Sequence, residues 1–194
     1  MRVIRTAALA ASALLVAVAA QAAPLKLQPA KPLSANLKPG LSVRYAWGGP
    51  PLAKIDNLTE ARDLLALEAK PGKPLRGLDY ADRSEFEPTL THKEHYNVAA
   101  DIRGYMKFEE PGIYEIETWS NDGIDARLSG QQVGLWLTRQ SCSANQRVEV
   151  EVPEPGWYKL EITYFQKYMN KCLMMKWGKK GSGMNWVPNS AFGR

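Results

Sequence analysis

The sequence lacks features that mark several classes of protein. It has only two cysteines and two histidines in 194 residues, too few for a disulfide-dense mini-protein or for most cysteine-based zinc sites. It contains no Gly-rich phosphate loop and neither a Gly-x-Ser-x-Gly nor a His-Glu-x-x-His motif. Hydrophobic residues make up 45% of the chain, which is too many for a disordered protein. We therefore expect a folded domain that is not an enzyme.

Long apolar runs are also missing, except at the N-terminus. Arg2 and Arg5 precede an uncharged stretch from Ala7 to Ala20, and Ala20-Gln21-Ala22 fits the small-x-small pattern that signal peptidase cleaves. We predict a signal peptide over residues 1–22 rather than a membrane anchor, which needs about 20 apolar residues. The mature protein is expected to be periplasmic or secreted, with no membrane-spanning segment.

The net charge changes once this segment is set aside. The whole chain carries +5, but two of its arginines lie in the predicted signal peptide, so the remaining 172 residues carry +3. Nucleic-acid binding requires a much denser basic surface. We therefore expect no nucleic-acid partner.

Export gives the two cysteines a specific meaning. In an oxidising compartment, a disulfide between Cys142 and Cys172 is the default expectation. Closing a loop of about 30 residues is worth roughly 3.7 kcal/mol in the chain-entropy model. The alternative is two unpaired thiols on neighbouring strands.

Two segments precede the main body of the chain. Residues 23–40 contain four prolines and no aromatic residue, which predicts a linker without regular structure. Further on, Asn57 and Glu60 have the spacing of a helix cap, and an apolar stripe follows at helical spacing: Leu58, Ala61, Leu64 and Leu65. Because Pro71-Gly72 ends this pattern, we predict one short helix.

The rest of the chain alternates apolar and polar residues with a period of two. Such runs begin at Leu41, Ala100, Ile113, Ala126 and later positions, and turn signals such as Asn121-Asp122-Gly123 separate them. Short strands at regular spacing are typical of an antiparallel β-sandwich or barrel. We therefore predict an all-β domain over residues 41–192.

Several of these segments, in order, resemble one known family. The motifs are Gly104-Tyr105-Met106-Lys107-Phe108, Pro111-Gly112-Ile113-Tyr114, Trp119-Ser120-Asn121-Asp122-Gly123, Leu128-Ser129-Gly130, the run from Pro155 to Phe165, and Leu173-Met174-Met175-Lys176-Trp177. Together they are similar to the PA-fourteen domain, which is named after anthrax protective antigen. The resemblance covers about Leu41 to Phe192. It implies a β-sandwich or barrel that serves as a carbohydrate-binding module.

The resemblance also implies a candidate metal site. In the sugar-binding flocculin branch of the family, two consecutive aspartates bind calcium, which then coordinates sugar hydroxyls. The matching positions here are Asn121 and Asp122, so the first carboxylate is an amide and one negative charge is lost. Asp125 could add a carboxylate. The family's partner loop precedes its last strand, and Asn170 is the nearest candidate at that place in this sequence. A purely structural turn is the alternative, because Asn, Asp and Gly suit tight turns.

Two tryptophans are candidates for stacking against a sugar. Trp119 precedes the polar turn at Asn121, and Trp136 lies opposite Leu135 and Leu137 in its strand pattern. Core packing is the alternative for both. The leading hypothesis is an exported, non-catalytic module that binds a glycan or cell-envelope polymer, with calcium as a cofactor. The alternative is a structural or protein-interaction component of the bacterial cell envelope that does not bind sugar.

Overall fold

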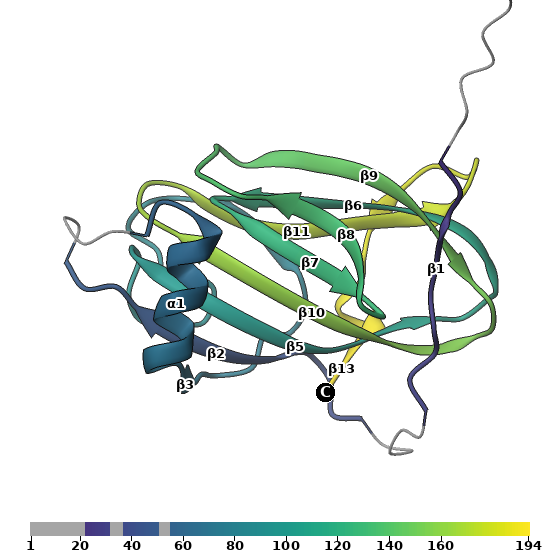
Figure 1. Ribbon diagram of the computed structural model, residues 1–194, viewed down its shortest axis with the longest axis horizontal. Helices are drawn as coiled ribbons and strands as arrows, with labels where there is room; N and C mark the ends of the chain where they lie inside the picture. Colours follow the sequence, from purple (N-terminus) through teal and green to yellow (C-terminus); the bar gives the residue numbers. More distant parts are fainter. Residues whose placement is uncertain (1–21, 32–36, 51–54) are drawn as a thin grey trace, which may run out of the picture.

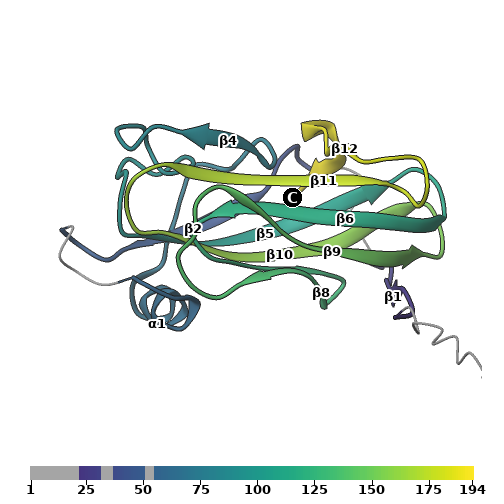
Figure 2. The ribbon, with the colours of Figure 1, turned by 90° about the horizontal axis from the view of Figure 1, so that it is seen from above.

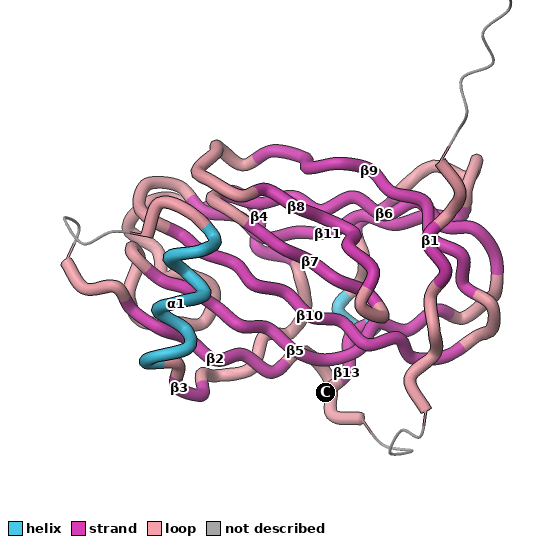
Figure 3. The backbone as a smooth tube through the Cα atoms, viewed as in Figure 1, coloured by secondary structure: helices cyan, strands magenta, loops and turns pink. Residues whose placement is uncertain are grey.

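The computed structural model describes residues 22–31, 37–50 and 55–194. Within these residues, two β-sheets face each other as the layers of a sandwich, and a single α-helix covers the outside of one sheet (Figures 1 and 3). The predicted all-β sandwich with one short helix is therefore confirmed. No described helix has the length and apolarity needed to cross a membrane. The predicted signal peptide lies, except for Ala22, outside the described residues and stays a prediction.

The first sheet has six strands in the order β1-β9-β6-β11-β12, and β4 pairs with β11 as well. Only the β1–β9 pair is parallel. Its strands are β1 (Leu25–Lys26), β4 (Asp79–Arg83), β6 (Gly112–Asn121), β9 (Ser143–Val152), β11 (Lys171–Lys179) and β12 (Asn185–Trp186).

The second sheet has seven strands in the order β3-β2-β5-β10-β7-β8, and β13 pairs with β5. A 3-10 turn, η1 (Asn189–Ala191), precedes β13. All pairs in this sheet are antiparallel. Its strands are β2 (Ser42–Trp47), β3 (Lys70–Pro71), β5 (Val98–Phe108), β7 (Ile124–Leu128), β8 (Gln131–Trp136), β10 (Gly156–Gln166) and β13 (Phe192–Gly193).

The core between the sheets follows the alternation of the sequence. In β10, Tyr158, Leu160, Ile162 and Tyr164 point into this core and are completely buried, while the residues between them lie on the outer face. An aromatic cluster fills one part of this core, where the ring of Phe108 lies 4.9 to 5.4 Å from those of Tyr114, Tyr158 and Trp177. Burying side chains of this size supplies most of the driving force for folding.

The helix α1 (Leu58–Glu68) begins as the sequence predicts. The side chain of Asn57 accepts a hydrogen bond from the backbone N–H of Glu60 at 3.0 Å. In return, the Glu60 carboxylate accepts from the backbone N–H of Asp56 at 2.7 Å. The apolar stripe packs on the outer face of the second sheet, in a small separate cluster with Ala46, Ala99 and Phe165. Figure 2 shows the helix lying outside the sandwich.

The segment predicted as an unstructured linker requires a correction. Leu25–Lys26 forms β1 along the edge of β9, and Leu27 is buried in the core. The backbone N–H of Ala30 also donates to the carbonyl of Trp157 at 2.8 Å. Prolines do not prevent this arrangement, because a strand added to a sheet edge can leave one of its sides unpaired. We refer to residues 22–31 as the N-terminal arm.

Candidate functional site

A cavity of about 510 Å³ opens at the end of the sandwich where β6 finishes and β11 begins. Three loops supply its walls: the β6–β7 connection, the β8–β9 loop and the β10–β11 loop, with β4 at the side. Its lining residues are Asp82, Asn121, Asp122, Arg139, Gln140, Ser141, Cys142, Tyr168, Met169 and Asn170. All three residues of the predicted metal set, Asn121, Asp122 and Asn170, are therefore brought to one cavity.

Asn121 is the last residue of β6 and lies opposite Cys172 in the register of β11. Its backbone carbonyl accepts a hydrogen bond of 2.5 Å from the Tyr164 hydroxyl, and its peptide bond to Asp122 is cis. The side chain is only 6% exposed, yet its Oδ1 atom has no hydrogen-bond donor. A buried carbonyl oxygen without a donor is uncommon in folded proteins. Because Asn121 lines the cavity, this is the atom that a ligand supplying positive charge or a hydroxyl group would satisfy.

Asp122 connects two of the three loops. Its carboxylate accepts from the backbone N–H of Lys167 at 2.8 Å and from that of Gln140 at 3.3 Å. Burial raises the pKa of Asp122 to about 6, against the lowering effect of those bonds and of the positive charge of Arg139. The chain then passes from the first sheet to the second, so the predicted turn does not form a hairpin. Gly123 is needed here because a Cβ atom would lie 2.3 Å from Phe165.

The predicted disulfide between Cys142 and Cys172 is confirmed, with Cα atoms 5.8 Å apart. It joins the β8–β9 loop to the start of β11, directly beside Asn121. Cys142 itself lines the cavity, whereas Cys172 is completely buried. The bridge therefore fixes one wall of the cavity to the sheet behind it.

Asn170 belongs to a tightly held β10–β11 loop. The amide of Gln166 donates to the backbone carbonyls of Tyr168 at 2.8 Å and of Asn170 at 3.0 Å. The side-chain amide of Asn170 reaches Asp82 on β4, at 3.4 Å. Asp82 is exposed and adds a second carboxylate to the cavity.

Sequence reasoning missed Asp82, Arg139 and Tyr168. The guanidinium of Arg139 lies 4.4 Å from the ring centre of Tyr168, which is 38% exposed. Cation–aromatic stacking of this kind holds both side chains in place. The three residues lie in separate segments of the chain, and only the fold brings them together.

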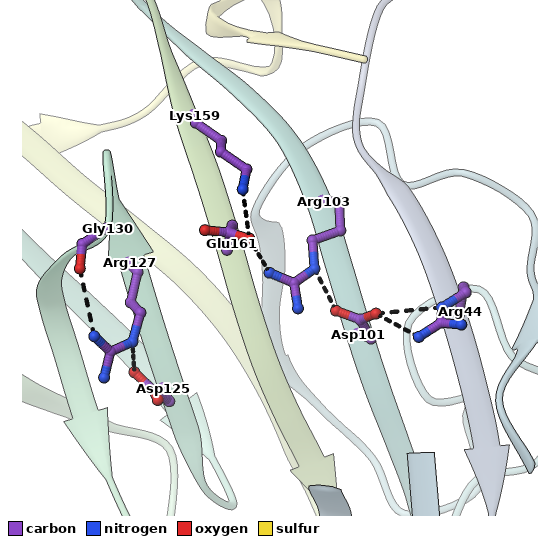
Figure 4. Close-up of polar contacts among 8 residues, drawn as sticks. All are labelled: Arg44, Asp101, Arg103, Asp125, Arg127, Gly130, Lys159 and Glu161. Carbon is purple, nitrogen blue, oxygen red and sulfur yellow. Dashed lines mark hydrogen bonds and ion pairs between the residues drawn. The ribbon is translucent and has the colours of Figure 1, made fainter. Parts of the chain in front are cut away.

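Asp125 does not contribute to the cavity, which corrects the expectation that it could add a carboxylate. It lies within β7, where Ile124 and Ala126 face the core, so its side chain points to the outer face of the second sheet. There it pairs with Arg62 at 2.6 Å and with Arg127 at 3.3 Å, the latter shown in Figure 4. A regular strand continues after Gly123, so the chain does not fold back as the metal interpretation required.

The two candidate tryptophans also lie outside the lining of the cavity. Trp119 packs against Trp186 on the outer face of the first sheet, with the ammonium of Lys176 within 5.0 Å of both ring centres. Trp136 is 42% exposed, and its indole N–H donates to the carbonyl of Arg139 at 3.3 Å. Trp136 therefore supports the backbone of the cavity loop, whereas Trp119 belongs to a separate surface cluster.

The cavity contains the kind of donor atoms that calcium prefers. Asp82 and Asp122 offer carboxylates, and Asn121 and Asn170 offer amide oxygens. Within the described part of the chain, no cluster of three or more His, Cys, Asp or Glu residues forms a metal site. The unpartnered oxygen of Asn121 fits a calcium ligand, but the small number of charges predicts weak binding.

Comparisons with known proteins identify the fold. The sequence matches no family model and no curated protein, whereas several solved structures match the fold. The PA14 domain of the antifreeze protein MpAFP has a TM-score of 0.64 at 14% identity, over 85% of this chain and 95% of that domain. The PA14 sugar-binding domain from an RTX adhesin has a TM-score of 0.61 at 15% identity, over 80% and 98%.

A third match is the epithelial adhesin 9 A domain from Candida glabrata, solved in complex with Galβ1-4GlcNAc. Its TM-score is 0.67 at 13% identity, over 88% of this chain and 95% of the adhesin domain. At these low identities the likeness establishes the architecture of the chain. The protein therefore has the fold of a PA14 domain, as the ordered motifs of its sequence implied.

Proposed function

We propose that this protein is an exported, non-catalytic carbohydrate-binding or adhesion module, and that the cavity at the end of the sandwich is its sugar site. The observation that carries the proposal is the buried Oδ1 of Asn121, which has no donor and belongs to a residue that lines the same cavity as Asp122. Sugar hydroxyls are donors as well as acceptors, so they suit a cavity rich in oxygen atoms. Of the solved structures with this fold, one is a sugar-binding domain of an RTX adhesin and another is an adhesin domain in complex with Galβ1-4GlcNAc.

Calcium is part of the proposal. Asn121 and Asp122 would hold the ion, and Asn170 and Asp82 lie in the same cavity to complete the set. A bound calcium ion would supply positive charge for sugar hydroxyl oxygens. With two carboxylates in the set, we expect a dissociation constant of roughly 10⁻⁴–10⁻³ M, at the weak end of the protein range.

Two independent features of the chain support the proposal that the protein is exported. The N-terminal segment has the pattern of a signal peptide, and the Cys142–Cys172 disulfide requires an oxidising environment to persist. Both features support a periplasmic or secreted location.

The test combines calcium calorimetry with a glycan array on the protein purified without residues 1–22. We expect a calcium heat and a glycan signal that a chelator abolishes. Tyr168→Ala should weaken glycan binding, because its exposed ring lines the cavity. Phe86→Ala removes another exposed aromatic ring, 80% exposed and outside the cavity lining, and serves as the matched control.

Two results would count against the proposal. If neither calcium nor any glycan binds, the chain is better explained as a structural or protein-interaction component of the cell envelope. If glycans bind and Phe86→Ala is as damaging as Tyr168→Ala, the sugar site lies elsewhere on the surface.

A further inference from the structure

Two arginines of the described ranges differ from the others in their ion pairing. Of the nine arginines in the described ranges, seven contact a carboxylate at 2.5 to 3.4 Å. Figure 4 shows three of them, Arg44, Arg103 and Arg127, each joined to an aspartate on the outer face of the second sheet. The two exceptions are the C-terminal Arg194 and Arg139, which lines the candidate sugar cavity.

Arg139 has no close carboxylate partner. The nearest carboxylate oxygen, Oδ1 of Asp56, is 3.9 Å from its Nη1 atom. That same oxygen already contacts the ammonium of Lys167. All 20 acidic residues of the sequence lie in the described segments, so no other carboxylate of this chain is within ion-pair distance. The guanidinium therefore has donors left for a ligand.

The position of Arg139 is fixed on several sides. Its guanidinium stacks over the ring of Tyr168 at 4.4 Å, and its backbone carbonyl accepts from the indole of Trp136. The next residue, Gln140, donates its backbone N–H to Asp122. A guanidinium held in this way loses little freedom when it binds, and its planar fork matches an oxyanion with two parallel hydrogen bonds.

The net charge of the cavity also favours a ligand that carries an oxyanion. Asp82 and Asp122 bring two negative charges to the lining, and Arg139 brings one positive charge. With calcium held as proposed above, positive charge exceeds negative charge by one. A neutral sugar would leave that excess unmatched, whereas a carboxylate or a sulfate would neutralise it.

We infer that Arg139 recognises an oxyanion on the ligand, so that the module selects acidic glycans, carrying a carboxylate or a sulfate, over neutral ones. This inference rests on the proposed function of the cavity as a sugar site. It specifies that the bound sugars are acidic, and it assigns the selection between acidic and neutral sugars to the side chain of Arg139.

The test uses sugars that differ at one carbon atom. Binding of galactose, galacturonic acid and galactose 6-sulfate, together with glucose and glucuronic acid, is measured by NMR titration of the full mature chain in excess calcium. We expect an acidic member to bind at least about tenfold more tightly than its neutral partner, as one charge-assisted bidentate contact allows. The preference should shrink as salt is added. Comparing the uronic acids with the sulfate shows which oxyanion fits.

Substitutions of Arg139 test whether this residue causes the preference for acidic sugars. Arg139→Gln should remove the preference, so that acidic and neutral sugars bind with equal affinity. Arg139→Lys should keep part of the preference through its charge alone. Arg76→Gln removes the same charge from an arginine that is 79% exposed and outside the cavity lining, and it should leave the preference unchanged. Thermal unfolding of each variant verifies that the fold is retained.

The outcomes separate this inference from the proposed function. Equal affinity of the wild-type protein for acidic and neutral sugars, or a preference that survives in Arg139→Gln, overturns the inference while the sugar site stands. Failure of every acidic and neutral sugar on the array to bind overturns both.

Discussion

The carboxylate of Asp122 accepts a hydrogen bond of 2.8 Å from the backbone N–H of Lys167, 45 positions further along the chain. Its other oxygen accepts from Gln140, so a single side chain fixes both the β8–β9 and the β10–β11 loop. Because burial nevertheless raises the pKa of this carboxyl group, its charge is costly to the fold. That cost can be measured.

The stability of the protein should depend on the protonation of Asp122. Its pKa rises from 3.8 to about 6 on folding, so the folded state holds the proton more tightly than the unfolded state. This stabilisation is fully present below about pH 4 and is lost as pH rises through about 6. The change is roughly 3 kcal/mol in the free energy of unfolding. Urea denaturation of the wild-type protein and of Asp122→Asn across this range measures it.

Subtracting the two stability profiles isolates the contribution of Asp122, since the other titrating groups cancel. A difference that is flat between pH 4 and 7 would show that the carboxyl group titrates normally. Calcium affinity should move in the opposite direction: it should increase as pH rises through about 6 and then level off, because the metal binds the ionised form.

Introducing a carboxylate at position 121 should strengthen calcium binding. In Asn121→Asp the metal site gains one negative charge, which is the main determinant of calcium affinity in oxygen-donor sites. We expect an increase of roughly tenfold or more, measured by calorimetry. Asn185→Asp adds the same charge on the exposed strand β12, outside the cavity, and should have no effect. Equal affinities in both variants would place the metal site elsewhere.

Removing the disulfide should destabilise the domain and loosen the cavity. The bridge closes a loop of 30 residues, which corresponds to about 3.7 kcal/mol in the chain-entropy model. Cys142→Ser combined with Cys172→Ser should lower the unfolding free energy by an amount of this order in urea titrations. Glycan affinity should fall at the same time, because Cys142 lines the cavity. A variant that loses neither stability nor affinity would contradict the role given to this bridge.

Lys171 should be essential for the segment between β4 and β5. Its side chain is 1% exposed, and its ammonium donates to the backbone carbonyls of Glu85, Glu87 and His95 at 2.6 to 3.2 Å. Lys171→Met would leave these carbonyls without their donor, at a cost of roughly 2–4 kcal/mol. Hydrogen exchange should show faster exchange over residues 84–96.

The matched control is Lys70→Met, which alters an exposed lysine of β3. A surface change of this kind is expected to shift stability by less than about 0.5 kcal/mol. Comparable losses in the two variants would mean that the buried ammonium is not what holds the segment.

The fold was largely predictable because its signals are local. The cap formed by Asn57 and Glu60 and the alternation in β10 depend on neighbouring residues, and each matches the structure. The N-terminal arm was missed because its pairing with β9 depends on an edge more than 100 residues away. Four prolines in the surrounding segment gave the opposite indication.

The site was predictable only in part, for the same reason. Asn121 and Asp122 are adjacent, so a motif could identify them, and Asn170 was reached through the resemblance. Three other residues of the site come from separate segments, and none of them lies in a recognisable sequence motif: Asp82, Arg139 and Tyr168. Asp125 was misassigned because a polar residue after a turn looks the same whether the chain folds back or continues as a strand.

The N-terminal arm lies at the end of the sandwich remote from the cavity loops, as both ribbon views show (Figures 1 and 2). It is secured to both sheets, by β9 on one side and by the Ala30 bond to β10 on the other. A force applied to the arm would therefore be passed to both sheets of the domain. A ligand held in the cavity would therefore lie at the opposite end of the domain from the arm, leaving the arm free of the ligand.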